Sequence, residues 1–278
     1  MSSFSVAQPG RPRALFDFYV TAMRTAVQAQ LQYRVNQYFW MLGWIAEPVI
    51  YLVVWTTIAE QSGGSVDGNT AGYFAAYYIV WTLVRNMNFG LSTYAWEWRI
   101  REGILSGQLL RPLHPIHYDL AFFAGWKFVA IALWIPIAIA LSLLFEPTLD
   151  PSMLEVVVFA VAIWGAYLIR SLNLWALGTV NFWTTRGAAL SELYIVVELL
   201  LSGRLVPLQL LPDWAQTLAG VLPFKWTFYF PIEALIGDLS QAELAEGLAM
   251  QVFWTAVGTA LVTVMWRRGI RRYSAVNG

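Results

Sequence analysis

The sequence of 278 residues contains no cysteine and few charged residues. Without cysteine, the chain has no disulfide bonds, thiolate metal ligands or cysteine nucleophiles, and its redox compartment stays undecided. Charged residues make up 12% of the chain, against about 25% in a typical soluble domain. Basic and acidic residues balance at 17 each. This neutral charge predicts no nucleic-acid partner.

The sequence also lacks the short motifs of common enzymes. It contains no Walker A sequence and no GxSxG, HExxH or GxGxxG. Its two histidines, His114 and His117, flank Pro115, which prevents a shared helical face. We interpret them as loop histidines at a membrane interface rather than as a zinc site. We therefore expect no catalytic residue, no metal and no cofactor bound by this chain.

Hydrophobic residues, in contrast, are abundant. They form 58% of the chain, and the mean hydropathy is +0.55. They occur in blocks of roughly 20 residues, the length that crosses a hydrocarbon core. We predict an all-α polytopic membrane protein with one transmembrane domain, residues 1–278. The six predicted transmembrane helices cover residues 39–59, 73–94, 118–145, 154–181, 188–206 and 248–266.

Two further segments are apolar but not suited to spanning. Residues 14–38 place apolar side chains on one helical face and Asp17, Arg24 and Gln28 on the other, which is typical of an amphipathic interfacial helix. A helix packed against the bundle is the alternative. Residues 203–237 are interrupted by four prolines, so we predict short re-entrant helices on the outer side before the last span.

Basic residues predict the orientation of the chain. The loops 60–72 and 146–153 contain no Lys or Arg. By the positive-inside rule these two loops face outward, while both termini and residues 97–116 and 182–187 are cytoplasmic. The basic residues of the cytoplasmic side are Arg11, Arg13, Arg24, Arg34, Arg99, Arg101, Arg111, Arg186, Arg267, Arg268, Arg271 and Arg272.

Six ionisable residues fall inside the predicted spans, three of each sign: Glu47, Arg85, Lys127, Arg170, Glu192 and Glu198. Buried charge is costly, so such residues are functional candidates. Glu47 with Arg85 and Arg170 with Glu198 are the pairs we expect. These charges either lock helix contacts as ion pairs or line a translocation path. The candidate intramembrane polar residues are Glu47, Trp81, Arg85, Asn88, Arg170, Asn173, Asn181 and Glu198.

A charged stretch between the second and third spans, residues 99–115, reads RIREGILSGQLLRPLHP. Residues 94–98 are expected to extend the second helix into it. The part EGILSGQLLRPLHP resembles a motif of the permeases of type-2 ABC exporters, with Ser106-Gly107 where an acidic residue is common in that family. Residues 202–224 resemble a second element of the family, a glycine followed by three prolines and a tryptophan. The interfacial helix and the layout with six spans and both ends inside are similar too.

The resemblance implies a permease subunit whose ATP, with Mg²⁺, is hydrolysed by a separate nucleotide-binding subunit. It also implies a second permease subunit, identical or related, in a lipid membrane that we expect to be the plasma (inner) membrane. Residues 97–116 would then form the cytoplasmic coupling element; a plain loop held at the interface by Trp96 and Trp98 is the alternative. The candidate coupling residues are Glu97, Arg99, Arg101, Glu102, Gly103, Leu105, Leu109, Leu110, Arg111, Pro112 and Pro115.

These observations predict a transporter rather than an enzyme. The expected function is ATP-driven export of an amphipathic or lipid-like molecule or a small organic cation. Two alternatives remain: an ion-coupled transporter or channel that uses intramembrane carboxylates, and a membrane-embedded enzyme acting on lipid.

Overall fold

The computed structural model describes residues 11–32, 34–184, 187–237 and 239–273. The two chain ends and Arg186, for which we predicted a cytoplasmic position, lie outside these residues. The side chains at positions 11, 34–42, 44, 45 and 188 lie outside them as well. These gaps include part of the predicted interfacial helix and of the first predicted span.

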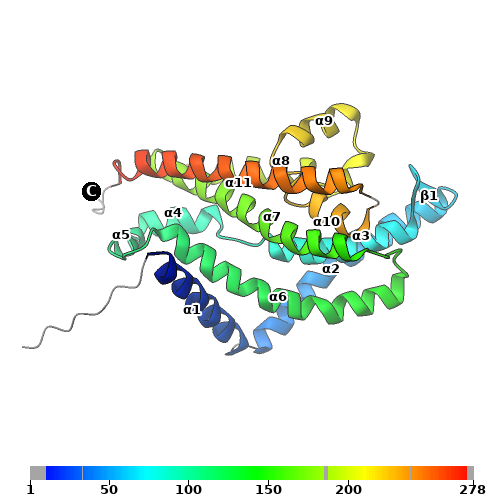
Figure 1. Ribbon diagram of the computed structural model, residues 1–278, viewed down its shortest axis with the longest axis horizontal. Coiled ribbons are helices and arrows are strands. Elements are labelled where there is room, and N and C mark those ends of the chain that lie inside the picture. The colour runs from blue at the N-terminus through cyan, green and yellow to red at the C-terminus, as the bar shows by residue number, and fades with distance from the viewer. Residues whose placement is uncertain (1–10, 33, 185–186, 238, 274–278) are drawn as a thin grey trace, which may run out of the picture.

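The described chain is almost entirely helical, as predicted, with one small hairpin (Figure 1). A turn at Asp67-Gly68, both at positive φ, joins the two short strands. The elements are α1 (Arg11–Gln32), α2 (Arg34–Gln61), β1 (Ser65–Val66), β2 (Asn69–Thr70), α3 (Ala71–Met87), α4 (Thr93–Arg101), α5 (Ile104–Leu109), α6 (Pro115–Phe145), α7 (Met153–Thr179), η1 (Val180–Phe182), α8 (Gly187–Leu201), η2 (Leu208–Leu210), α9 (Asp213–Val221), α10 (Tyr229–Ile236) and α11 (Gln241–Gly269).

Three helical stretches in the described chain are long and apolar enough to cross a membrane: Pro115–Phe145, Met153–Phe182 and Gln241–Gly269. They correspond to the third, fourth and sixth predicted spans. The helices in the second and fifth predicted spans, α3 and α8, have only 17 and 15 residues. The chain is therefore an all-α membrane protein, and its count of six spans stays a prediction.

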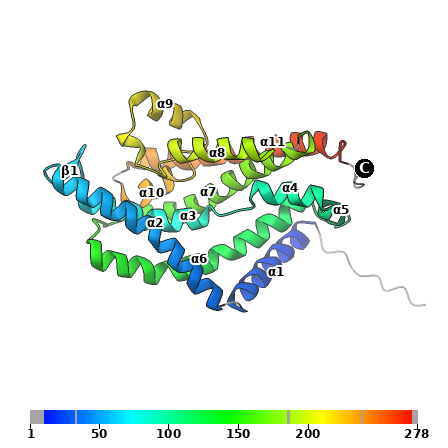
Figure 2. The same ribbon diagram turned by 180° about the vertical axis from the view of Figure 1, so that it is seen from behind.

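Helix α3 forms the centre of the core. Its side chains from Phe74 to Val84 are buried all around the helix, including the fully buried Tyr77 and Trp81. Figure 2 shows α2, α6 and α7 running beside it, and α10 packs against it as well. A helix that is apolar on every side is stable only inside a bundle or a membrane.

The segments predicted to face opposite sides of the membrane lie at opposite ends of the bundle. The loops without basic residues meet at one end, where the Thr148 amide donates to the carbonyl of Gly72 at 3.0 Å. Helices α4 and α5, the beginning of α1 and the end of α11 lie together at the opposite end (Figure 1). The predicted outward and cytoplasmic segments are thus separated along the long axis.

Helix α1 packs on the first half of α6. The ring of Phe18 meets Tyr118 edge to face at 4.9 Å between centroids, and the Tyr19 hydroxyl lies 3.0 Å from Nδ1 of His117. A Cβ at position 125 would lie 2.7 Å from the Cβ of Ala26, so Gly125 permits this close approach. Packing against the bundle, one of the two alternatives, is therefore observed. A position in the membrane interface remains a prediction.

The segment 203–237 forms the short helices that the prolines predict, namely η2, α9 and α10. Side chains from α3 and α11 satisfy its irregular backbone. The hydroxyl of Tyr77 donates to the Gly203 carbonyl at 2.6 Å, and Nε2 of Gln251 donates to the Trp226 carbonyl at 2.8 Å. Such donors are required where non-helical backbone is buried away from water. Re-entry of this segment into the membrane stays a prediction.

Candidate functional site

The second predicted span is interrupted near its end. We predicted one helix over residues 73–94 with an extension to Trp98, and this prediction is wrong: α3 ends at Met87 and α4 begins at Thr93. The side chain of Ser92 accepts a hydrogen bond from the Ala95 amide and caps α4, which is a strong local start signal. The hydropathy pattern continues across this break, so composition did not reveal it.

Two cations cap the broken end of α3. Nζ of Lys127, on α6, donates to the carbonyls of Asn86, at 3.2 Å, and Phe89. Nη1 of Arg170, on α7, donates to the Asn88 carbonyl at 2.7 Å. The Asn86 carbonyl also accepts a turn hydrogen bond from the Phe89 amide at 3.2 Å. The end of a helix leaves carbonyls without α-helical donors and carries partial negative charge. Two basic side chains, on α6 and α7, thereby donate to the carbonyls of a helix end inside the bundle.

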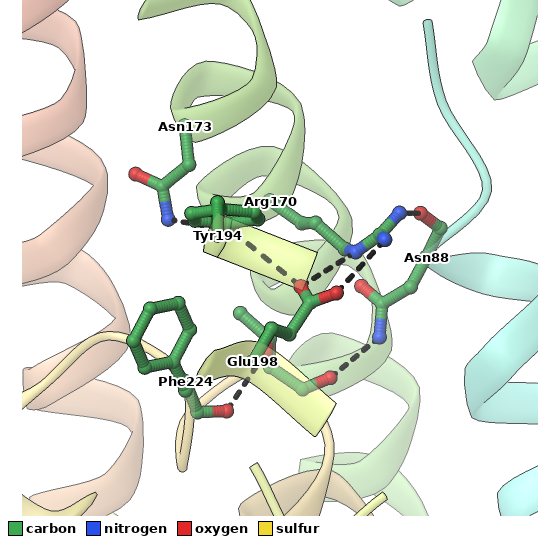
Figure 3. Close-up of polar contacts among 7 residues, drawn as sticks. Asn88, Arg170, Asn173, Tyr194, Glu198 and Phe224 are labelled. Carbon is green, nitrogen blue, oxygen red and sulfur yellow. Dashed lines mark hydrogen bonds and ion pairs between the residues drawn. The ribbon is translucent and has the colours of Figure 1, made fainter. Parts of the chain in front are cut away.

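Arg170 also forms the predicted pair with Glu198 (Figure 3). Its Nε and Nη2 donate to the two carboxylate oxygens at 2.7 and 2.9 Å. The Glu198 side chain is completely buried. The Tyr194 hydroxyl donates to Glu198 at 3.4 Å, and Asn173 donates to Tyr194 at 3.4 Å. The buried carboxylate is thus surrounded by donors from α7 and from its own helix, α8.

The same centre reaches the irregular segment before α10. Nδ2 of Asn88 donates to the Thr227 carbonyl at 2.6 Å, and the Thr227 hydroxyl donates to the Phe224 carbonyl at 2.8 Å (Figure 3). Asn88, Arg170, Asn173 and Glu198 from our candidate set therefore lie together. The α3 break and the turn at residues 224–228 are connected through them.

The second predicted pair forms elsewhere and is less buried. Nη2 of Arg85 lies 2.6 Å from Oε2 of Glu47, with side chains 29% and 31% exposed. Arg204, which the sequence analysis did not select, lies 4.0 Å from the other Glu47 oxygen. The guanidinium of Arg85 stands 5.4 Å from the ring centroid of Trp81. A partly exposed group of three charges therefore lies on α2, α3 and the chain after α8.

The remaining two candidates, Trp81 and Asn181, are uncharged and belong to neither set of ion pairs. Trp81 is fully buried, so it lines no open surface of this chain. Asn181 lies in η1, where its Nδ2 donates to the Gly178 carbonyl at 3.0 Å. A cavity of about 380 Å³ brings Asn181 and Thr184 together with Glu97 and Arg101 of α4. Asn181 thus neighbours the coupling candidates, not Arg170.

Most coupling candidates lie on or next to two short consecutive helices, α4 and α5 (the α4–α5 element), which Gly103 connects. Gly103 has φ of 67°, a left-handed conformation that a glycine adopts without strain. Arg99 binds Asp119 of α6 through two hydrogen bonds of 2.7 and 2.8 Å. Nε1 of Trp175 donates to the same carboxylate at 3.1 Å. Arg99 therefore makes an internal contact that holds α4 against α6.

Aromatic packing also anchors α4. Trp96 is fully buried and meets the ring of Trp175 edge to face at 4.6 Å between centroids. A Cβ on Gly178 would overlap the indole of Trp96, so only glycine allows this contact. Leu105 of α5 is fully buried in the same cluster. The Trp96 ring is enclosed by α7 and α11, so Trp96 does not hold the element at the membrane interface. Trp98 is 57% exposed, and a loop held at the interface through Trp98 stays an alternative.

The other coupling candidates lie at the surface. Leu110 is 89% exposed, Arg101 and Glu102 are exposed, and Arg101 pairs with Glu97 at 3.1 Å one helical turn away. Leu109 and Pro112 are exposed as well, whereas Pro115 is buried as the first residue of α6. The element is thus fixed from within and presents a mixed apolar and charged tip.

The histidine beside this tip, His114, is partly buried. The His114 ring meets Trp266 at 4.5 Å between centroids, and its Nδ1 accepts from the Ile116 amide at 3.3 Å. Burial, together with the nearby His117, lowers the pKa of His114 to about 4. The described residues contain no cluster of three or more His, Asp or Glu side chains placed to hold a metal ion. His114 is a neutral cap of α6.

Sequence reasoning missed Asp119, Arg204 and Thr227, and it gave Lys127 no role. Asp119 lies at the start of a predicted span, and its distance of 20 residues from Arg99 in the sequence did not indicate that the two side chains pair. Thr227 acts through its backbone carbonyl, which any residue would supply. A count of intramembrane charges suggested Lys127, but its partners are carbonyls of a helix break that the sequence does not reveal.

Comparison with known families identifies the chain. No curated protein matches it. The family model described as ABC-2 family transporter protein matches residues 45–276, which include α3 to α11, the polar centre and the α4–α5 element. This match confirms the resemblance seen in the sequence. The chain belongs to the ABC-2 family of transporter proteins.

Proposed function

We propose that the chain is the permease subunit of an ATP-driven exporter in the plasma (inner) membrane, with six spans and both termini in the cytoplasm. A separate ATPase subunit binds ATP and Mg²⁺ and hydrolyses the nucleotide. The cargo is an amphipathic or lipid-like molecule or a small organic cation. Membership in the ABC-2 family supports this proposal over an ion-coupled transporter, a channel or a membrane enzyme.

The observation that carries the proposal is the construction of the α4–α5 element. Its inner face is fixed by the Arg99–Asp119 pair and by buried Trp96, while its tip exposes Leu110 and Glu102. An exposed apolar side chain beside charges suits a polar protein partner. Rigid attachment to α6 and α7 suits an element that transmits movement of that partner.

The partly exposed charges of Glu47, Arg85 and Arg204 support a second permease subunit. Charged side chains that face lipid are strongly disfavoured, so this surface requires a protein or water-filled environment. A second permease packed against α2 provides one, and a path between the two subunits would then contain the three charges. The aromatic ring of Trp81 beneath Arg85 is not exposed to such a path.

The ion-coupled alternative receives less support from the buried carboxylate. Both oxygens of Glu198 accept hydrogen bonds from Arg170, and a second basic group, Lys127, lies at the same helix break. A carboxylate already neutralised in this way has little affinity for a transported cation.

The proposal is tested by variants of the exposed tip. Glu102→Lys and Arg101→Glu should leave expression and insertion intact, because exposed charges contribute under about 1 kcal/mol to folding. The double change Pro112→Ala with Pro115→Ala loosens the turn before α6, and because Pro115 is buried its expression and insertion are measured first. All three variants should reduce association with the ATPase or uncouple hydrolysis from transport. Glu60→Lys, an exposed charge reversal at the opposite end of the bundle, is the matched control. Wild-type association and coupling in all three tip variants would refute the proposal.

A further inference from the structure

A groove of about 540 Å³ lies between α1, the α4–α5 element and the beginning of α6. Its volume is within the range of about 300–1,000 Å³ found for small-molecule sites. One wall consists of small side chains of α1, including Ala22, Ala26 and Ala29, and another carries Phe122 and Phe123 of α6. These two walls are therefore apolar, which suits an alkyl chain.

One end of the groove is basic. Arg99, Asp119 and Arg111 line it, and Arg99 and Asp119 neutralise each other as an ion pair. Within the described part of the chain, no carboxylate lies within ion-pairing distance of Arg111. Its guanidinium stands 4.9 Å from the ring centroid of Tyr118, which orients it beside the groove. One positive charge is thus left to meet an anion.

Next to this charge the groove holds an unused acceptor. Oε1 of Gln108 is buried and has no hydrogen-bond partner among the described residues. A buried acceptor without a donor is unfavourable. Arg111 therefore offers a binding partner for an anion, while Gln108 offers one for a hydroxyl group.

We propose that this groove binds one anionic phospholipid with a hydroxylated headgroup, of the phosphatidylglycerol type. The phosphate pairs with Arg111, a headgroup hydroxyl donates to Gln108, and part of an acyl chain lies between the alanines of α1 and the phenylalanines of α6. The proposed orientation places the groove at the cytoplasmic leaflet, whose anionic lipids attract basic segments. This lipid is a bound component of the permease, separate from its transported cargo.

The test uses the purified full chain with equimolar phosphatidylglycerol and phosphatidylcholine, and measures retained lipid by native mass spectrometry. The wild type should retain phosphatidylglycerol preferentially. Arg111→Gln should lower that preference about fivefold to tenfold, the usual effect of one basic residue at an anionic surface, and Arg111→Lys should preserve most of it. Arg268→Gln, which removes an exposed charge at the end of α11, is the matched control and should change nothing.

Two further variants separate the parts of the site. Ala29→Trp fills the groove from its exposed wall and should displace the lipid even if Arg111→Gln fails to fold. In a second equimolar mixture, of phosphatidylglycerol and phosphatidic acid, which lacks the headgroup hydroxyls, the wild type should favour phosphatidylglycerol and Gln108→Leu should lose that preference. Equal losses in Arg111→Gln and Arg268→Gln would show only a general charge effect and overturn the proposal. Equal retention of phosphatidylcholine by the wild type, or unchanged retention in Ala29→Trp, would overturn it as well.

Discussion

The Arg170–Glu198 pair allows a quantitative prediction about the stability of the polar centre. Polar contacts between membrane helices contribute about 0.6 kcal/mol on average, whereas removing one partner of a buried ion pair costs about 3–5 kcal/mol. The larger value applies here because the Glu198 side chain is fully buried, Arg170 is 14% exposed, and two parallel hydrogen bonds join them. At an effective dielectric constant of about 20, charges about 4 Å apart attract by ~4 kcal/mol.

We therefore expect Glu198→Gln to destabilise the chain by about 3–5 kcal/mol, since the guanidinium stays buried without its counter-charge. Arg170→Met should cost at least as much, because it also removes the donor to the Asn88 carbonyl. The double variant Arg170→Met with Glu198→Met removes both charges and leaves mainly that carbonyl unpaired. It should cost about 1–3 kcal/mol, less than either single change.

The absence of cysteine provides a direct assay. A single Ala162→Cys reporter, at a fully buried position of α7, reacts with a thiol-reactive fluorophore only when the protein unfolds. On heating, a loss of about 3 kcal/mol should lower the transition by about 10 °C. Tyr194→Phe, which removes only a 3.4 Å hydrogen bond to Glu198, is the mild control. Single variants each below about 1 kcal/mol, with an additive double variant, would refute the reasoning.

Three other predictions follow from the remaining contacts. Arg85→Ala should destabilise the chain by under about 1 kcal/mol, because the pair with Glu47 is partly exposed and Arg204 stays nearby; a larger loss in the same thiol assay would contradict this. Cysteine at Ser106 should resist a membrane-impermeant thiol reagent in intact cells while cysteine at Asp67 reacts, and labelling of Ser106 would reverse the proposed orientation. Gly178→Ala should lower the free energy of unfolding by about 1–3 kcal/mol in the thiol assay and weaken the coupling of ATP hydrolysis to transport, since the new Cβ overlaps Trp96. Gly107→Ala, whose Cβ meets no neighbour within 4 Å, is the control and should be neutral or slightly stabilising in the thiol assay.

The sequence predicted much of the helical architecture because long apolar blocks have few alternatives in a membrane. Helices α6, α7 and α11 contain the predicted spans 118–145, 154–181 and 248–266 almost completely. Prolines at 207, 212 and 223 correctly indicated that a long helix does not follow α8. Both expected ion pairs form, since opposite charges at similar depth on neighbouring helices have few other partners.

The break between α3 and α4 could not be predicted from the same pattern. Residues 88–92 are NFGLS, whose single glycine is tolerated in a membrane helix and whose other residues suit a helix or a loop. Side chains from other helices stabilise the break. Lys127 of α6 lies 39 residues after Asn88 in the sequence, and Arg170 of α7 lies 82 residues after it. Non-local donors of this kind leave no periodic signal, so the sequence favoured one continuous helix.

The intramembrane charges had two interpretations, structural ion pairs or the lining of a translocation path. The position of each charge now indicates which interpretation suits it. Lys127 and Glu198 are buried and the Arg170 side chain is 14% exposed, and each is satisfied by carbonyls or by an opposite charge at the α3 break, so they contribute to structure at this site. Glu47 and Arg85 retain about a third of their exposure, on a surface where lipid contact would be unfavourable. A substitution that abolishes transport while preserving stability is therefore expected among the partly exposed charges. At the buried centre, loss of transport should accompany loss of the fold.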